Sequence, residues 1–349
     1  MDDDGLLTIG AFARLSRLSP KALRLYDELE LLRPARVDRW SGYRHYAPEQ
    51  LPQARLVSWL RQLGMPLARI REVVRLPPTA AAAEVMVFWA EQERSHLHRR
   101  DLADALLDEL TGRETAMSAH ESTVRWAALS DTGLVRQANQ DTAYAGPGLL
   151  AVADGYGPDG GAAGSAVVSA LREAVASAGD EGLPAALAGA VARAGATVAE
   201  LPDSGTTVTA LAWRGAQLAL AHLGDSRAYL LRDGQLFRIT EDHSYVQSLV
   251  AEGRLTPEEA EVHPQRALLL RALDGSSGTR AELSLRRSEP GDRYLLASDG
   301  LAAVAAEEAI GRVLAAASEP DGAVRELVAL ARAEGGPDNI AVAAAFVAA

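Results

Sequence analysis

Five aspartates in the C-terminal part of the chain have neighbours that suit a metal-binding role. Each stands beside glycine or another turn residue, and two of them, Asp154 and Asp299, follow apolar runs that indicate buried strands. The five are Asp141, Asp154, Asp225, Asp299 and Asp338. A carboxylate buried without a partner is costly, and hard divalent cations such as Mg²⁺ and Mn²⁺ take carboxylate and water oxygens. One Asp-Gly pair would indicate only a turn, but five such positions predict a site for a divalent cation.

Other reactive residue types are missing or placed differently. The chain has no cysteine, which excludes disulfides, thiolate metal ligands and a cysteine nucleophile. His243 and His263 are expected to order the segment 242–271 and not to bind metal. The glycine-rich run 160–164 resembles a phosphate-binding loop only loosely, because it lacks the lysine of such loops and the single lysine, Lys21, lies elsewhere.

Strands and helices are expected to alternate around these aspartates. The expected strands are 124–129, 149–153, 206–213, 218–223, 228–231, 294–297 and 340–346, and the expected helices are 162–177, 184–198, 245–252, 257–261, 306–316 and 322–333. Turn signals such as the Arg-Asp-Gly of 232–234 join neighbouring strands as hairpins. Consecutive hairpins flanked by helix pairs predict an α+β fold, an α-β-β-α layered sandwich, and not a doubly wound parallel sheet.

The N-terminal part of the chain indicates a second, basic module. Residues 5–76 carry 13 Lys and Arg against 6 Asp and Glu, a net charge of 13 − 6 = +7, although the whole chain has a net charge of −12. Thr8 and the Ser-Pro pair at 19–20 are placed to begin two short helices. An extended run at 43–46 follows a turn, and helices are expected at 48–63 and 66–75. This order predicts a winged helix-turn-helix, and the positive charge favours a polyanionic partner.

Residues 79–112, between the two modules, predict one long helix with an apolar stripe along one face. Such a stripe favours pairing with a second copy and therefore a homodimer. A rigid spacer packed on its own domains is the alternative.

The domain organisation expected from these patterns is 6–76, 79–112 and 122–349, in keeping with a chain of 349 residues. The first residues do not have the character of a signal peptide, and no apolar run is long enough to span a bilayer. We therefore expect a cytoplasmic protein with no membrane partner.

The basic module resembles the MerR family of transcription regulators. The Thr-Ile-Gly-Ala-Phe-Ala-Arg-Leu of 8–15 and the Lys-Ala-Leu-Arg-Leu-Tyr of 21–26 resemble the family's helix-turn-helix, and the Gly-Tyr-Arg-His-Tyr of 42–46 resembles its wing. The Leu-Gly-Met-Pro-Leu of 63–67 resembles the start of its second helical pair. The resemblance implies binding to duplex DNA at a twofold operator, and an antiparallel coiled-coil dimer through 79–112.

Five side chains of this module are candidates for DNA contact. Guanidinium and phenol groups on a recognition helix and a wing can hold backbone phosphates. Those on the expected helix and wing are Arg24, Tyr26, Arg39, Tyr43 and Arg44. Arg17 and Leu25 depart from the glycine and the aromatic residue that are usual in the family. A helix-turn-helix that serves only as a protein-docking module is the alternative to DNA binding.

The aspartates occur in an order that resembles the metal-dependent phosphatases of the type 2C class, over about 122–347. The matching runs are 136–141, 152–157, 204–207, 224–227, 242–244, 263–266, 295–301 and 335–340. The resemblance implies Mn²⁺ or Mg²⁺ as cofactor, with two ions and a third, weaker one, and a phosphorylated protein as substrate. By this resemblance Asp154 bridges two ions and the Gly155 carbonyl binds one of them, while Asp299 and Asp338 add carboxylate ligands. Asp141 holds metal-bound water, and Asp225 matches the site of the third ion. Arg136 holds the substrate phosphate.

The reaction that this resemblance implies is hydrolysis of phosphoserine or phosphothreonine by a water that two metal ions activate, without a covalent phosphoenzyme. Three positions depart from the family. Gln140 stands where a glutamate is frequent, Tyr156 replaces a histidine, and the Pro-Asp at 158–159 interrupts a glycine pair. The sequence thus predicts a DNA-binding transcriptional regulator with phosphatase activity. The alternative is a regulator whose phosphatase-like domain is a catalytically weak or inactive sensor.

Overall fold

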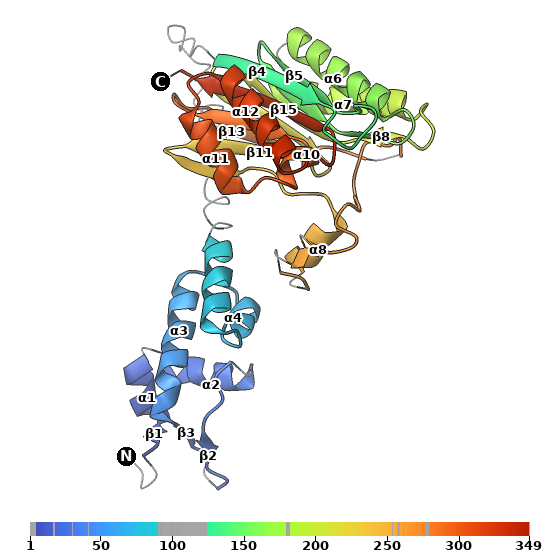
Figure 1. The fold of residues 1–349 in the computed structure, drawn as a ribbon. Helices are drawn as coiled ribbons and strands as arrows, with labels where there is room; N and C mark the ends of the chain where they lie inside the picture. Colours follow the sequence, from blue (N-terminus) through green and yellow to red (C-terminus); the bar gives the residue numbers. More distant parts are fainter. Residues whose placement is uncertain are drawn as a thin grey trace. The chain divides into compact units, whose positions relative to one another are not determined.

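The computed structural model describes residues 5–16, 18–29, 31–40, 42–89, 92, 99, 103, 124–178, 182–252, 254–256, 259–260, 262–276 and 279–348. The chain divides into two compact units, Met1–Glu93 and Arg94–Ala349, here called the N-terminal unit and the C-terminal unit (Figure 1). Residues 78–89 are helical, but most of the long helix expected at 79–112 lies outside the described residues. No helix in the described part of the chain is long and apolar enough to cross a membrane.

Short helices and a three-stranded sheet of order β1-β3-β2 form the N-terminal unit. The elements are β1 Leu7–Thr8, α1 Ile9–Ser16, α2 Pro20–Glu28, β2 Arg36–Val37, β3 Arg44–Tyr46, the 3-10 turn η1 Pro48–Gln50, α3 Leu51–Gln62 and α4 Leu67–Val73. Both predicted caps are confirmed. Thr8 Oγ1 accepts a hydrogen bond from the Ala11 N–H at 3.3 Å, and Ser19 Oγ accepts one from the Ala22 N–H at 3.0 Å. Each hydroxyl thereby satisfies an N–H of the first helical turn.

The core of this unit fixes the wing strand to the helices. The rings of Phe12 and Tyr46 stack with their centroids 4.5 Å apart, and neither is exposed. Leu23 and Ile70, from α2 and α4, belong to the same buried cluster. The helix-turn-helix and the wing therefore share one core.

Two five-stranded antiparallel sheets form the centre of the C-terminal unit. The first has the order β13-β10-β9-β6-β5, and the second has the order β12-β11-β14-β15-β4. Their strands are β4 Val124–Asp131, β5 Thr142–Gly146, β6 Leu149–Ala153, β9 Val208–Arg214, β10 Gln217–Leu223, β11 Arg227–Arg232, β12 Gln235–Arg238, β13 Glu282–Arg287, β14 Arg293–Ala297 and β15 Ile340–Val347. A short pair, β7 Gly155–Tyr156 and β8 Gly205–Thr206, lies beside them.

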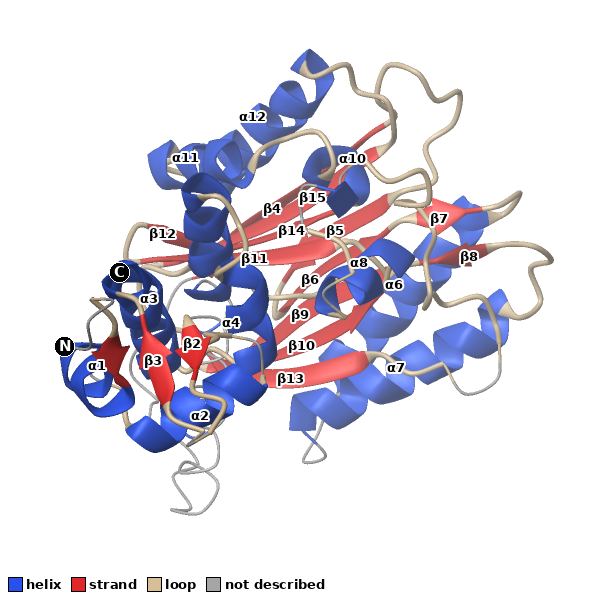
Figure 2. Ribbon diagram, turned by 90° about the horizontal axis from the view of Figure 1, so that it is seen from below, coloured by secondary structure: helices blue, strands red, loops and turns tan. Residues whose placement is uncertain are grey.

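Helices cover the outer face of each sheet, as Figure 2 shows. The helices that cover the sheets are α6 Gly160–Ser177, α7 Gly182–Val198, α11 Glu307–Ala316 and α12 Pro320–Ala333, and two shorter helices are α8 Tyr245–Ala251 and α10 Asp299–Ala302. One buried cluster joins α6 and α7 to the first sheet, a second joins α11 and α12 to the second sheet, and a third fills the space between the sheets. Strand β15 is buried at every position because both of its faces are covered. The predicted α-β-β-α sandwich is confirmed.

Candidate metal centre and nucleic-acid interface

Three of the five predicted aspartates lie at one end of the first sheet. Thr142 of β5 pairs with Ala153 of β6, so Asp141, which precedes β5, and Asp154, which follows β6, share that end. Strands β6 and β10 both pair antiparallel with β9 and therefore run in the same direction. Asp225, in the turn after β10, consequently lies at the end of the sheet that holds Asp154.

The other two aspartates come to the same region from the second sheet. Ala297 of β14 pairs with Val342 of β15, so Asp299, just after β14, and Asp338, just before β15, lie at one end. Asp225 lies in the turn between β10 of the first sheet and β11 of the second. That turn brings the two groups of carboxylates together.

The carboxyl groups influence one another strongly. Burial raises the pKa of Asp141 to about 7, and Asp299 contributes to the shift. Burial and the charge of Asp299 likewise raise the pKa of Asp225 to about 7. The pKa of Asp154 lies well above its ordinary value because of burial and the charges of Asp141, Asp299 and Asp225. Removal from water and like charge both disfavour the ionised forms, and the nearby Arg136 and Arg227 do not fully offset them.

The donor set fits a hard divalent cation. The Asp141 Oδ2 atom is buried and has no hydrogen-bond partner, although a buried acceptor ordinarily has one. A cation among these oxygens would supply the missing partner and further positive charge. Within the described ranges no three acidic or histidine side chains are already arranged as a metal site. We therefore expect the carboxylates to reorient as ions bind.

Main-chain contacts hold Asp154 in place. Its N–H donates to Thr207 Oγ1 at 3.0 Å, and its carbonyl accepts from Thr206 Oγ1 at 3.0 Å and from the Thr207 N–H at 2.8 Å. The next residue, Gly155, packs so closely on the Gly160 backbone that a Cβ would lie 2.2 Å from its carbonyl oxygen. The supporting role of the two threonines was not predicted, although their Gly-Thr-Thr motif is visible in the sequence.

Arg136, the candidate phosphate-binding residue, lies beside the cluster. Its Nη2 donates to Asp338 Oδ2 at 2.6 Å, and the guanidinium remains more than half exposed. The charges of Asp299 and Asp154 also act on it. One side of this arginine thus faces the aspartates while another is open to solvent. Nearby, the Gln140 side chain donates to the Gly157 carbonyl at 2.7 Å and so supports the loop before α6.

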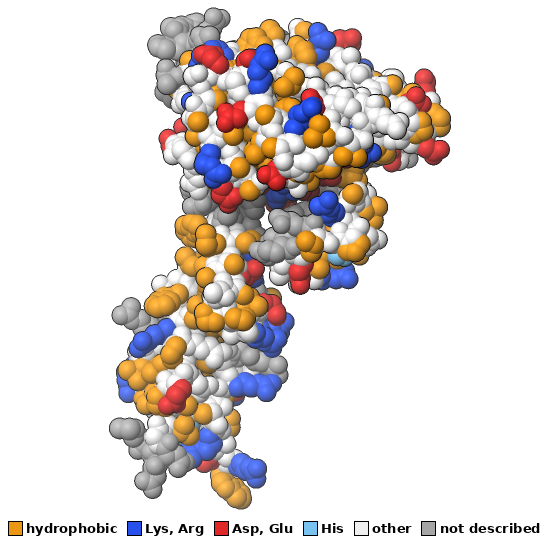
Figure 3. Space-filling model, viewed as in Figure 1, with side chains coloured by type: hydrophobic (Ala, Val, Ile, Leu, Met, Phe, Trp, Pro, Cys, Tyr) orange, Lys and Arg blue, Asp and Glu red, His pale blue; other side chains and the backbone are white. Residues whose placement is uncertain are grey.

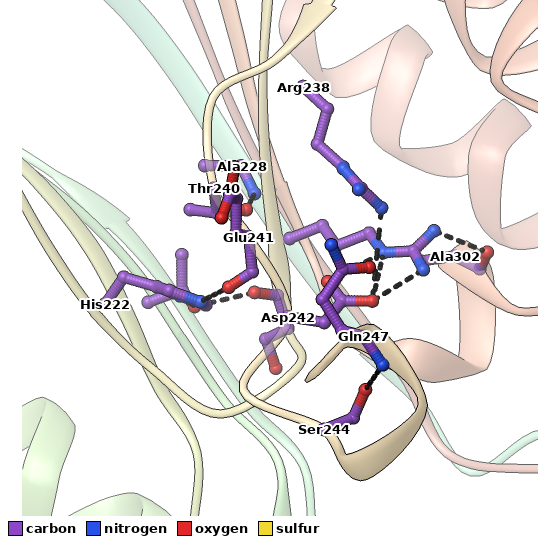
Figure 4. A network of polar contacts seen from close by, with 12 residues as sticks. His222, Ala228, Arg238, Thr240, Glu241, Asp242, Ser244, Gln247 and Ala302 are labelled. Atoms are coloured by element: carbon purple, nitrogen blue, oxygen red, sulfur yellow. Dashed lines mark hydrogen bonds and ion pairs between the residues drawn. The ribbon is translucent and has the colours of Figure 1, made fainter. Parts of the chain in front are cut away.

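The anchor segment, residues 239–244 between β12 and α8, is fastened to the sheets by a polar network (Figure 4). Arg227 Nη2 donates to Asp242 Oδ2 at 2.7 Å, and Arg227 Nη1 donates to the Ala302 carbonyl at 3.3 Å. Arg238 lies 3.9 Å from the same carboxylate. The Arg227 pair keeps the pKa of Asp242 below its ordinary value despite burial. The sequence predicted an ordering role for this region but not the arginines that anchor it.

His222 joins the first sheet to the anchor segment. Its Nε2 lies 2.9 Å from the Glu241 carbonyl oxygen, and its Nδ1 lies 3.0 Å from Thr209 Oγ1. Because a carbonyl only accepts, Nε2 carries the proton of the neutral ring, and Nδ1 shares the single Thr209 hydroxyl proton with the Ser226 carbonyl oxygen, which lies 3.0 Å from Thr209 Oγ1. Burial, followed by the nearby His243 ring, lowers the pKa of His222 to about 4, although Asp242 and Glu282 act in the opposite direction.

This histidine should make folding stability depend on pH. Between about pH 6.5 and pH 4 the unfolded chain binds a proton that the folded chain excludes, so stability falls as the pH falls. The loss from His222 should reach about 2 kcal/mol at pH 5. Urea unfolding of wild type and His222→Asn from pH 8 to pH 5 measures it, and the variant should show the shallower dependence. Parallel curves would rule this contribution out.

Three of the predicted DNA contacts are available on the N-terminal unit. Arg24 is exposed on α2, and Arg39 and Tyr43 are exposed around the turn between β2 and β3. The face drawn in Figure 3 carries Lys and Arg side chains along this unit, among exposed hydrophobic ones. Trp40, which was not predicted as a contact, is 98% exposed in the same turn.

The structure corrects one expected contact and restricts another. Tyr26 is 6% exposed, because its ring lies on the inner face of α2 in the core, so it is not available for a DNA contact. Arg44 Nε donates to Asp27 at 2.7 Å and ties β3 to α2. Helical periodicity accounts for both: Leu23, Tyr26 and Asp27 share the side of the helix that faces the rest of the unit.

Comparisons with known proteins agree with both parts of this architecture. Residues 7–76 match the family described as MerR HTH family regulatory protein, and residues 135–333 match protein phosphatase 2C. The serine/threonine protein phosphatase PstP of Mycobacterium tuberculosis is 46% identical over 235 residues, which cover 64% of this chain and 45% of PstP. This chain thus spans less than half the length of that relative.

Solved structures give the same result for the C-terminal unit. The PstP crystal structure has a TM-score of 0.62 and 44% identity, and the match covers 65% of this chain and 99% of that structure. The PstP catalytic domain in complex with two manganese ions has a TM-score of 0.61 and 42% identity, covering 65% and 99%. The phosphatase family match extends over more than half of the chain. Together with the fold and the aspartate cluster, it defines the class of protein to which this chain belongs. The chain belongs to the protein phosphatase 2C family, and its residues 7–76 are a MerR helix-turn-helix domain.

Proposed function

We propose that this protein is a DNA-binding transcriptional regulator that also hydrolyses phosphoserine and phosphothreonine in a partner protein, with Mn²⁺ or Mg²⁺ as cofactor. The observation that carries the phosphatase part is the convergence of Asp141, Asp154, Asp225 and Asp299 at one end of the two sheets, where burial and nearby like charge raise their pKa values. Such a cluster is unfavourable without cations. In the related PstP catalytic domain, two manganese ions are bound.

Each residue of the cluster has a proposed task. Asp154 would bridge two ions, and the Gly155 carbonyl would bind one of them. Asp299 and Asp338 would supply further carboxylate ligands. Asp141 would hold water and Asp225 a third ion. When bound, the ions would lower the pKa of a water and so activate it for in-line attack on phosphorus.

Arg136 would hold the substrate phosphate from the solvent side. Its guanidinium has five N–H donors in a planar fork, which match phosphate oxygens as well as carboxylate oxygens. Since it is more than half exposed and bonded to Asp338, it can turn toward an incoming phosphate without crossing the core. It would neutralise charge as that charge redistributes in the transition state.

The substrate class is tested with peptides of one sequence that carry phosphoserine, phosphothreonine or phosphotyrosine. We expect the full chain to release phosphate from the first two in the presence of Mn²⁺. No release from any peptide by folded protein would favour the alternative of a sensor domain. That alternative draws support from Gln140, whose neutral side chain is engaged by the Gly157 carbonyl.

For the N-terminal unit we propose binding to duplex DNA as a homodimer in the cytoplasm, with residues 79–112 as the dimerisation helix and domains at 6–76 and 122–349. The exposed arginines on α2 and in the wing turn support the DNA partner, because guanidinium groups neutralise phosphates. Light scattering of the full chain tests the dimer, and a monomer at micromolar concentration would contradict it.

DNA binding should be salt-dependent and should require the exposed arginines. The probe is a labelled 40-base-pair duplex of random sequence, with affinity measured by fluorescence anisotropy in 50 and 200 mM KCl. We expect affinity to fall at least ~10-fold over this range, and each lost phosphate contact to reduce the salt slope by about 0.9. Arg24→Ala and Arg39→Ala should lower both affinity and slope. The control is Arg325→Ala, which removes an exposed arginine of the C-terminal unit. Equal DNA affinity of all variants would favour the alternative in which the N-terminal unit is a protein-docking module.

A further inference from the structure

His243 of the anchor segment is bonded twice to Gly224, the residue before Asp225. The His243 N–H donates to the Gly224 carbonyl at 2.8 Å, and the Gly224 N–H donates to His243 Nδ1 at 3.1 Å. Both main-chain polar groups of Gly224 are therefore satisfied by one residue that lies nineteen positions away in the chain.

The ring of His243 is itself held on its other sides. Its Nε2 lies 3.4 Å from Glu282 Oε2 and 3.2 Å from Arg271 Nη1, and its plane lies against His222 with the centroids 4.8 Å apart. Since Nδ1 accepts from an N–H, the proton of the neutral ring is on Nε2 and points toward the Glu282 carboxylate, and the Arg271 guanidinium, which can only donate, lies beside Nε2 without a hydrogen bond to it. The side chain is 10% exposed. The ring is therefore a fixed support for the Gly224 turn.

The turn is held on its other side by threonines of the first sheet, and the Ser226 carbonyl accepts from Thr209 Oγ1 at 3.0 Å. Gly224 has φ of +113°, and a Cβ there would lie 2.6 Å from the Thr207 side chain, so no larger residue could fill the position. After Asp225, Ser226 Oγ lies 2.7 Å from Thr207 Oγ1, the same atom that accepts from the Asp154 N–H. Asp225 is thus supported through Ser226 by the framework of Asp154, and through Gly224 by His243.

We propose that His243 is a positioning residue for the Asp225 carboxylate, and that its hydrogen bond from Gly224 sets the affinity of the ion that Asp225 binds. This inference rests on the proposed metal-dependent function. It assigns to His243 a role beyond the ordering of its own loop. The His243 carbonyl also accepts from the Leu270 N–H at 2.8 Å. His243 therefore forms hydrogen bonds both with the turn before Asp225 and with the segment after α8.

Two substitutions at His243 distinguish the contribution of Nδ1 from that of Nε2. In His243→Asn the amide oxygen takes the place of Nδ1 and can still accept from the Gly224 N–H. In His243→Gln the amide reaches toward the Nε2 position, beside Glu282, and the acceptor for Gly224 is lost. His263→Ala is the matched control, because His263 Nδ1 accepts only from the nearby Gln265 N–H at 3.1 Å among the described contacts.

The readouts are exchange of the Gly224 amide hydrogen in the metal-free full chain and the Mn²⁺ binding isotherm. We expect His243→Gln to speed exchange and to weaken the weakest ion about 10-fold or more, as loss of an outer support does at other metal sites. His243→Asn and His263→Ala should stay within about 3-fold of wild type by the same reasoning. Equal behaviour of His243→Asn and His243→Gln, or an unchanged isotherm in both, would overturn the proposal. Neither readout depends on phosphatase activity. A wild type that binds Mn²⁺ but releases no phosphate would therefore contradict the phosphatase proposal and leave the proposal for His243 standing.

Discussion

Replacing Asp154 by asparagine should reduce kcat for a phosphothreonine peptide at least ~10³-fold. Asp154 is the carboxylate on which Asp141, Asp225 and Asp299 all act, and it is the residue proposed to bridge two ions. Asparagine keeps the shape but removes the charge that would hold both ions at once. Phosphate release in saturating Mn²⁺ measures the effect.

Loss of folding would not explain this result. Removing one carboxyl group from a cluster of like charges should leave the stability of the metal-free protein unchanged or slightly increased. Asp321→Asn is the control, because Asp321 is exposed on α12 and pairs only with Arg325 among the described contacts. Retention of more than about a tenth of wild-type kcat by Asp154→Asn would contradict an essential charge at this position.

Replacing Asp292 by alanine should destabilise the C-terminal unit by about 3–5 kcal/mol. Asp292 is 1% exposed, and both of its oxygens accept from Arg232, at 2.7 and 2.6 Å. The Tyr294 hydroxyl also donates to it, at 2.8 Å. The variant leaves a buried guanidinium without its main partner, and that loss costs far more than the net contribution of the pair. Urea unfolding at pH 7 measures the change.

An exposed ion pair in the same unit gives the comparison. Asp321 and Arg325 form an i,i+4 pair on α12 and both side chains are more than 60% exposed. Asp321→Ala should therefore change stability by less than about 1 kcal/mol. Similar losses for Asp292→Ala and Asp321→Ala would show that burial does not decide the effect of these pairs.

Strands buried on both faces were predictable, since their sequences are continuous apolar runs. Strand β6 was predicted with its observed bounds, and β15 and β14 to within one residue. Strands β5, β12 and β13 were missed, because each lies at the edge of a sheet and mixes polar with apolar residues. Edge strands are defined by their partners more than by their own composition.

The candidate site was predictable in its residues but not in its contacts. The aspartates were identified because glycine and turn residues flank them and because their order resembles one family. The supports came from distant positions: Thr207 holds the Asp154 backbone, and His243 holds Gly224. Tyr26 was misplaced because an aromatic residue on a short helix suits a core as well as a DNA contact. Only the packing of α2 decides between the two.

A manganese titration of the chelator-treated full chain tests the metal centre most directly. Free Mn²⁺ is read by electron paramagnetic resonance, and phosphate release from a phosphothreonine peptide is recorded in the same samples. We expect no release without metal, and release that rises with the number of ions bound until the site is saturated. Release that does not depend on metal, or saturation of folded protein without any release, would contradict this expectation.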